Sequence, residues 1–81
     1  MPIVDFGKLN ENRLGLKIDK KIMQGLRYLE KELYLSKEHA HDVLDITYEL
    51  IRLAGEFNEV SNRRLDIPGY LGRYQRLRDK Y

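Results

Sequence analysis

The 81-residue chain contains no cysteine and no tryptophan, only two prolines, and no long uninterrupted run of apolar residues. Without cysteine it has no disulfide, no thiolate metal site and no cysteine nucleophile, which suits a cytoplasmic protein. Without an apolar run of about 18 residues, no membrane-spanning helix is expected. The first residues also lack the charged and apolar regions of a secretory signal. The sequence therefore predicts a soluble, cytoplasmic protein that does not associate with membranes.

Sequence motifs that carry catalysis are also absent: there is no Gly-rich phosphate loop, no His-Glu-x-x-His pair, no nucleophile elbow and no Cys-His combination. The two histidines, His39 and His41, point about 200° apart on a helix, so they cannot share a metal ion. His41 shares a helix face with Asp45 and Glu49, but the repeated Glu-x-x-His elements of metal sites in helical bundles are missing. We therefore predict a protein that is not an enzyme and uses no metal or cofactor.

Charge is distributed unevenly along the chain, although the formal net charge is only +2. Residues 1–60 carry nine Lys or Arg against eleven Asp or Glu, whereas residues 61–81 carry six against two. A chain of this length forms one domain with a small core. The expected parts of that single domain are an N-terminal arm (1–18), a helical core (19–64) and a basic, tyrosine-rich C-terminal segment (65–81).

Two short apolar pieces, separated by turn-like residues, open the chain. In the second piece, Leu14-Gly15-Leu16-Lys17-Ile18, apolar residues alternate with others, which is typical of a strand. An isolated two-stranded hairpin is marginal in water, so such an arm has to pack on the helices or wait for a partner. We predict an extended arm over residues 1–18, with a hairpin and an irregular packed arm as the alternatives.

Apolar residues at intervals of three and four predict helices in the rest of the chain. Asp19, Ser36 and Asp66 stand where these helices begin and are suitable N-caps. The expected helices cover about residues 20–34, 37–64 and 68–80. The sequence thus predicts an all-α fold: a helical hairpin plus a short C-terminal helix, with an extended N-terminal arm.

Two arrangements of the first two helices compete. In the hairpin, the second helix buries a seam that consists of Val43, Ile46, Leu50, Leu53, Phe57 and Val60. In the alternative, one helix runs from Lys20 to Arg64 as part of a coiled-coil dimer, in a heptad register that puts small or polar residues in the seam, namely Ser36, Ala40, Thr47 and Ser61. The hairpin buries the larger side chains, at about 25 cal/mol per Å² of apolar area, and is the arrangement that we predict.

The helix over residues 37–64 has an apolar side that is too wide for one neighbour. This side spans roughly 200° of the helix circumference, whereas a surface helix needs about 100°. We therefore expect it to contact a second element, either another part of the chain or a second copy in a homodimer. The opposite side forms an acidic rail, which consists of Glu38, Asp42, Asp45, Glu49 and Glu56.

The C-terminal segment combines tyrosines with basic residues. Tyr70 and Tyr74 share one face of the last helix with Leu77. They either pack on the second helix, which would bring the flanking arginines against the acidic rail, or they contact a protein or nucleic acid. The basic residues available for nucleic-acid binding are Arg63, Arg64, Arg73, Arg76, Arg78 and Lys80.

A chain this short without a catalytic motif is expected to work by occupying a surface. We predict a small regulatory or adaptor protein that binds another protein through the N-terminal arm, the acidic rail or the face of Tyr70 and Tyr74. One alternative is a nucleic-acid-binding regulator that uses the six basic residues. The other is a structural component of a larger assembly.

Overall fold

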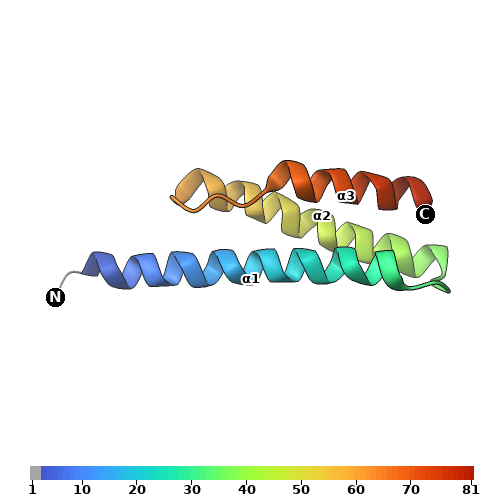
Figure 1. Cartoon of the computed structure of the whole chain (residues 1–81), viewed down its shortest axis with the longest axis horizontal. Helices are drawn as coiled ribbons and strands as arrows, with labels where there is room; N and C mark the ends of the chain where they lie inside the picture. Colours follow the sequence, from blue (N-terminus) through green and yellow to red (C-terminus); the bar gives the residue numbers. More distant parts are fainter. Residues whose placement is uncertain (1–2) are drawn as a thin grey trace.

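The computed structural model describes the backbone of residues 3–81 and the side chains of residues 12–81. Its helices are α1 (Ile3–Lys31), α2 (Lys37–Val60) and α3 (Ile67–Lys80), and no strand occurs in this part of the chain. The first two helices form an antiparallel hairpin, and α3 folds back along it, so that the C-terminus lies near the connection between α1 and α2 (Figure 1). The predicted all-α hairpin with a short C-terminal helix is therefore confirmed. Among the described residues, no helix combines the length and the apolar content that crossing a bilayer requires.

Polar side chains define where α2 and α3 begin. The Ser36 hydroxyl accepts a hydrogen bond from the backbone N–H of His39 at 3.1 Å, and the Asp66 carboxylate accepts one from Gly69 at 3.2 Å. Each bond satisfies an N–H that has no partner within the helix, as expected of an N-cap. Pro68 stands in the first turn of α3, where its missing N–H costs nothing. The caps predicted at Ser36 and Asp66 are confirmed.

The second helix ends at Val60, four residues before the predicted end at residue 64. Ser61 takes an extended backbone conformation, and its hydroxyl accepts the backbone N–H of Arg63 at 3.1 Å. The side chain of Asn58 then holds the connection to α3, because it exchanges two hydrogen bonds with the backbone of Leu65, at 2.8 and 3.0 Å. These local bonds replace the helical ones and turn the chain back toward the core.

Residues 12–18 lie within α1, so the strand predicted there is wrong. Ile18 and Ile22 are buried four residues apart, as the helical period requires, whereas Leu14 and Leu16 are 49% and 56% exposed. The helical period prevails because the row of buried residues of α1 continues without interruption to its last turn. The remainder of the predicted arm lies outside the part of the chain for which side chains are described.

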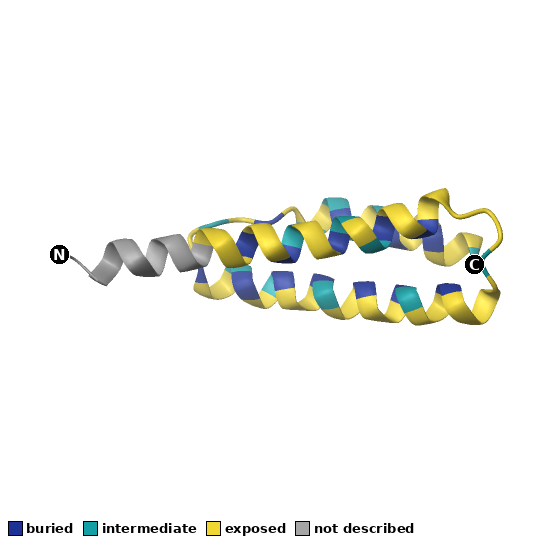
Figure 2. Ribbon diagram, turned by 90° about the horizontal axis from the view of Figure 1, so that it is seen from below, coloured by how far each residue is buried: buried dark blue, intermediate teal, exposed yellow. Residues whose placement is uncertain are grey.

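A continuous core follows the axis of the bundle and draws on all three helices (Figure 2). Its residues are Ile18, Ile22, Leu26, Leu29, Ala40, Leu44, Ile51, Ala54, Phe57, Leu65, Tyr70, Tyr74 and Leu77. The two long helices approach most closely at Gly25, where an added Cβ would overlap the hydroxyl of Thr47. Thr47 is itself buried, and its hydroxyl donates to the carbonyl of Val43 at 2.8 Å. The absence of a side chain at residue 25 thus sets the distance between α1 and α2.

The side of α2 that faces the core differs from the predicted seam. Three seam residues are strongly exposed: Ile46 at 62%, Leu53 at 45% and Val60 at 82%. Phe57 is buried as predicted, and the other buried residues of α2 are Ala40, Leu44, Thr47, Ile51 and Ala54. The prediction compared seams by side-chain size alone. In the structure, α2 packs against two helices, and small residues on the side of α1 allow the two backbones to approach, which brings more atoms into contact than a row of large side chains would.

Polar contacts attach α3 to α1. The Tyr70 hydroxyl donates a hydrogen bond to the carboxylate of Asp19. Asp19 lies inside α1, which begins at Ile3, so it is not the helix cap that was predicted. The Tyr81 hydroxyl donates to the backbone carbonyl of Leu29 at 3.0 Å. Together with the buried tyrosine rings, these bonds hold α3 in the groove between α1 and α2.

Candidate functional site

One side of the α1–α2 hairpin is covered by α3 and the opposite side is open. On α1, Met23 contacts α3, and Tyr28 lies about 140° around the helix from it. On α2, the ring of Tyr48 packs against that of Tyr74 in α3, with 5.4 Å between ring centroids. Ile46 lies about 160° around the helix from Tyr48. The surface opposite α3 is therefore formed by the α1–α2 hairpin alone, and we call it the open face.

Large apolar side chains are exposed on the open face. They are Leu14, Tyr28, Ile46, Leu53 and Val60, with exposed fractions between 39% and 82%. Their numbers are separated by multiples of seven within each helix, so each set forms a straight row along one side. Sequence reasoning assigned the α2 row to the core and missed its companion row on α1. The seven-residue spacing on both helices was the signal that could have identified this face.

All five residues of the acidic rail are exposed. Within residues 12–81, the rail has one ion pair, between Glu49 and Arg52 of the same helix at 3.7 Å, and none with α1 or α3. The predicted contact between the rail and the arginines of α3 is therefore wrong. Arg73 turns to α1 instead, where it makes two hydrogen bonds to Glu30. The rail is left free to contact another molecule.

The pair of Glu30 and Arg73 is a structural contact between α1 and α3. Hydrogen bonding to Arg73 lowers the pKa of the Glu30 carboxyl below its usual value, and the same hydrogen bond raises the pKa of Arg73. The positive charges of Arg76 and Arg27 lower the pKa of Glu30 further. Since both side chains remain partly exposed, solvent screens the pair and its contribution to stability is small.

Tyr70 and Tyr74 are buried, with 4% and 3% of their surface exposed. Burial raises the pKa of the Tyr70 hydroxyl well above its usual value, and the hydrogen bond to Asp19 raises it further. The structure thus places both rings in the core, which is the packing role that the sequence analysis offered as one alternative. Their faces are turned inward, away from a partner protein or a nucleic-acid base.

The six basic residues proposed for nucleic acid differ in what surrounds them. Four are engaged within the chain: Arg63 lies over Gly15, Arg64 donates to the carbonyl of Asn58, Arg73 pairs with Glu30, and Arg78 donates to the hydroxyl of Tyr74. Arg76 and Lys80 are exposed, and the ammonium group of Lys80 lies 5.1 Å from the ring centroid of Tyr81. With Tyr70 and Tyr74 buried, the expected surface of alternating aromatic and basic side chains is not formed by these residues.

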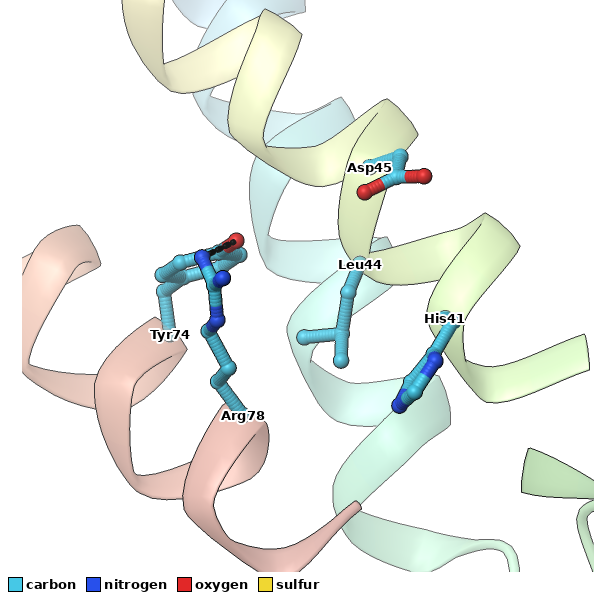
Figure 3. Close-up of a pocket in the computed structure, with 5 residues that line it drawn as sticks. All are labelled: His41, Leu44, Asp45, Tyr74 and Arg78. Carbon is cyan, nitrogen blue, oxygen red and sulfur yellow. Dashed lines mark hydrogen bonds between the residues drawn. The ribbon is translucent and has the colours of Figure 1, made fainter. Parts of the chain in front are cut away.

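A small pocket of 170 Å³ lies between α2 and α3 (Figure 3). It is lined by His41, Leu44, Asp45, Tyr74 and Arg78. Three of its polar side chains are already bonded, because Arg78 donates to the Tyr74 hydroxyl at 3.3 Å and the His41 ring bonds to the backbone oxygen of Tyr81 at 3.1 Å. The pocket is smaller than the roughly 300 Å³ typical of ligand sites. Among the described residues, no group of three His, Cys, Asp or Glu side chains is arranged to hold a metal ion.

No protein-family model matches this chain, and no curated protein or solved structure is similar to it. Function is therefore inferred from the surfaces described above. Of these, the open face and the adjoining acidic rail are features that the fold itself does not use.

Proposed function

We propose that this chain is a small, non-enzymatic regulatory or adaptor protein that acts by binding another protein through the outer side of α2. The observation that carries this proposal is the exposed apolar row of Ile46, Leu53 and Val60, which runs directly beside the acidic rail. An apolar row supplies affinity when it is removed from water, and charges beside it orient the partner and exclude wrong ones. The surface suits a partner segment with apolar and basic side chains.

We further propose that the protein works in the cytoplasm and that self-association is part of its function. A monomer would bind one partner through the apolar row and the rail and so block that partner's surface, whereas a dimer would use the residues of each rail that it leaves exposed and thereby bridge two partners. Both modes use binding energy alone, and neither requires a cofactor.

Affinity capture from the native host, after nuclease treatment, tests the proposal. The test variant neutralises two rail residues, through Glu38→Gln and Asp45→Asn. The matched control removes the same amount of charge elsewhere, through Glu59→Gln and Asp79→Asn. We expect a protein that is captured by the wild type and the control to be lost with the rail variant, and to bind the purified wild-type chain directly.

Capture of the same proteins by all three chains, or of none, would contradict this role for the rail. Two alternatives then remain. Nucleic-acid binding through Arg76, Lys80 and the neighbouring basic residues would appear as affinity for generic DNA or RNA that falls steeply as salt is raised. A structural role in a larger assembly would appear as concentration-dependent oligomers beyond a dimer.

A further inference from the structure

We propose that the open face is the contact between two copies of this chain, related by a two-fold axis parallel to the helices, so that α1 of each copy lies against α2 of the other. This inference rests on the self-association in the proposed function and names its surface and geometry. It follows from how charge is divided between the two helices that form the face.

The edge of α1 beside the open face is basic. Residues 12–31 contain six Lys or Arg and two acids, Asp19 and Glu30. Both acids are bonded to α3, on the covered side of the hairpin. The edge of α2 is acidic, since residues 37–60 contain six Asp or Glu against two basic residues. An apolar surface therefore lies between a basic border on α1 and an acidic border on α2.

Two rows of exposed polar residues form these borders, each with a spacing of seven. The basic row on α1 consists of Lys17, Gln24 and Lys31, and the acidic row on α2 consists of Asp42, Glu49 and Glu56. Residues seven apart lie on the same side of a helix, so each row runs straight along the border of the open face.

The charges on these borders select one of two symmetric arrangements. When two copies meet through the same face, the two-fold axis lies in the plane between them, either across the helices or parallel to them. An axis across the helices places α1 on α1 and α2 on α2, so that like charges oppose each other. An axis parallel to the helices places the basic row of each copy against the acidic row of the other. Since like charges in an interface are unfavourable, the parallel axis is the favoured arrangement.

The basic row and the acidic row also have their residues at matching positions along the axis of the bundle. Within one chain, Gly15 lies beside Phe57 and Gly25 lies beside Thr47, which fixes the offset between the antiparallel helices. The same offset, to within about one residue, puts three pairs level: Lys17 with Glu56, Gln24 with Glu49, and Lys31 with Asp42. A two-fold axis parallel to the helices preserves these levels, so the same pairs meet across the interface, and each occurs twice.

The apolar rows match in the same way. Leu14 is level with Val60 and Tyr28 with Ile46, while the stem of Lys21 is level with Leu53. The dimer would have a four-helix centre in which each helix has antiparallel neighbours, with α3 of each copy on the outside.

The size of the face predicts a weak dimer. From residue 14 to residue 28 the face is about 21 Å long, and two helices are about 20 Å wide, which gives a footprint of about 400 Å² per copy. Interfaces of this size lie at the low end of specific contacts, so we expect a dissociation constant in the micromolar range.

Sedimentation equilibrium of the full chain, at about 1–200 µM, tests whether this face is the interface. Leu53→Lys places a charge in the middle of the face and is expected to weaken dimerisation more than about tenfold, because its ammonium group would lie level with that of Lys21 of the other copy. The matched control is Gln75→Lys on the exposed side of α3, which is expected to leave the dimer unchanged. Circular dichroism verifies that each variant is folded.

Charge reversal tests the direction of the axis. Lys17→Glu and Glu56→Lys are each expected to weaken the dimer about tenfold, because the two-fold axis doubles every change. The double variant restores opposite charges at both places and is expected to return to within about threefold of the wild type. With the axis across the helices, Lys17 would lie against the basic α1 of the other copy and Glu56 against its acidic α2, so neither single reversal would weaken the dimer.

The outcomes separate this inference from the proposed function. A wild-type chain that stays monomeric overturns both the self-association and this interface, while binding through the acidic rail remains measurable by capture. A dimer that tolerates Leu53→Lys overturns the surface but leaves self-association intact. Single reversals without effect overturn the parallel axis. A monomer that loses a captured partner on Leu53→Lys assigns the face to that other protein and overturns the dimer.

Discussion

Replacing Gly25 by alanine is expected to destabilise the protein, although alanine is the better helix former. An added Cβ would overlap the hydroxyl of Thr47 and would also lie 3.6 and 3.7 Å from two of its carbons. Thr47 cannot turn away easily, because its side chain is β-branched and 1% exposed, and its hydroxyl is bonded to the carbonyl of Val43. Relief therefore requires α1 and α2 to move apart.

The expected change in the free energy of unfolding is the difference between two contributions. Overpacking a tight contact costs about 1–3 kcal/mol, and replacing glycine by alanine inside a helix returns about 1 kcal/mol. The net effect is therefore a loss of between about 0 and 2 kcal/mol of unfolding free energy. For a chain of this length, whose total stability is on the order of 4–12 kcal/mol, that loss is readily measured.

Urea denaturation followed by circular dichroism, at protein concentrations below the dimer range, measures the effect. Gly55→Ala and Gly72→Ala are matched controls, because an added Cβ at either position meets no atom within 4 Å. Both controls are expected to stabilise the chain by about 0.5–1 kcal/mol. When Thr47 is also replaced by alanine, Gly25→Ala is no longer expected to lower the free energy of unfolding. A Gly25→Ala chain that is stabilised as much as the Gly55→Ala and Gly72→Ala chains would refute the close contact between α1 and α2.

Three further perturbations address the core and the attachment of α3. Leu26→Ala is expected to cost about 2–5 kcal/mol in thermal or urea unfolding, because Leu26 is fully buried between the helices. Glu30→Gln is expected to cost no more than about 1 kcal/mol at neutral pH, where Glu30 is ionised and paired with Arg73. Because the pKa of Glu30 is lowered in the folded state, this difference is complete above its ordinary value of 4.5 and fades as the pH falls through the lowered value. Tyr70→Phe is expected to cost about 1–2 kcal/mol, since the hydroxyl donates to the charged Asp19.

Specific results would contradict the predictions for Leu26, Glu30 and Tyr70. A Leu26→Ala chain with an unchanged unfolding midpoint would mean that this side chain is not in the core. A Glu30→Gln difference that persists at pH 2 would trace the loss to packing and not to the ion pair. Ultraviolet titration should show the Tyr70 hydroxyl ionising above the usual pH range of a tyrosine, because burial raises its pKa. Ionisation of all tyrosines together in the folded protein would contradict the burial of Tyr70.

The sequence alone determined the helices and the caps that begin two of them. Ser36 and Asp66 act on backbone N–H groups three residues away, so their role depends on local spacing that a sequence displays directly. The hairpin could also be predicted, because a single long helix would expose its apolar side. The burial of Tyr70 and Tyr74 was anticipated as one alternative, since their spacing matches the helical period.

Only the tertiary structure decided which side of α2 faces inward and which partners the charged residues take. The width of the apolar side of α2 allowed more than one register, and the choice depends on the contact of Gly25 with Thr47 and on the position of α3. Likewise, Arg73 selects Glu30, which is 43 residues away, over the acidic rail, because packing brings α3 beside α1 on that side. Local pattern fixes the period of a helix, whereas its orientation about its own axis is set by the shapes of the neighbours that it packs against.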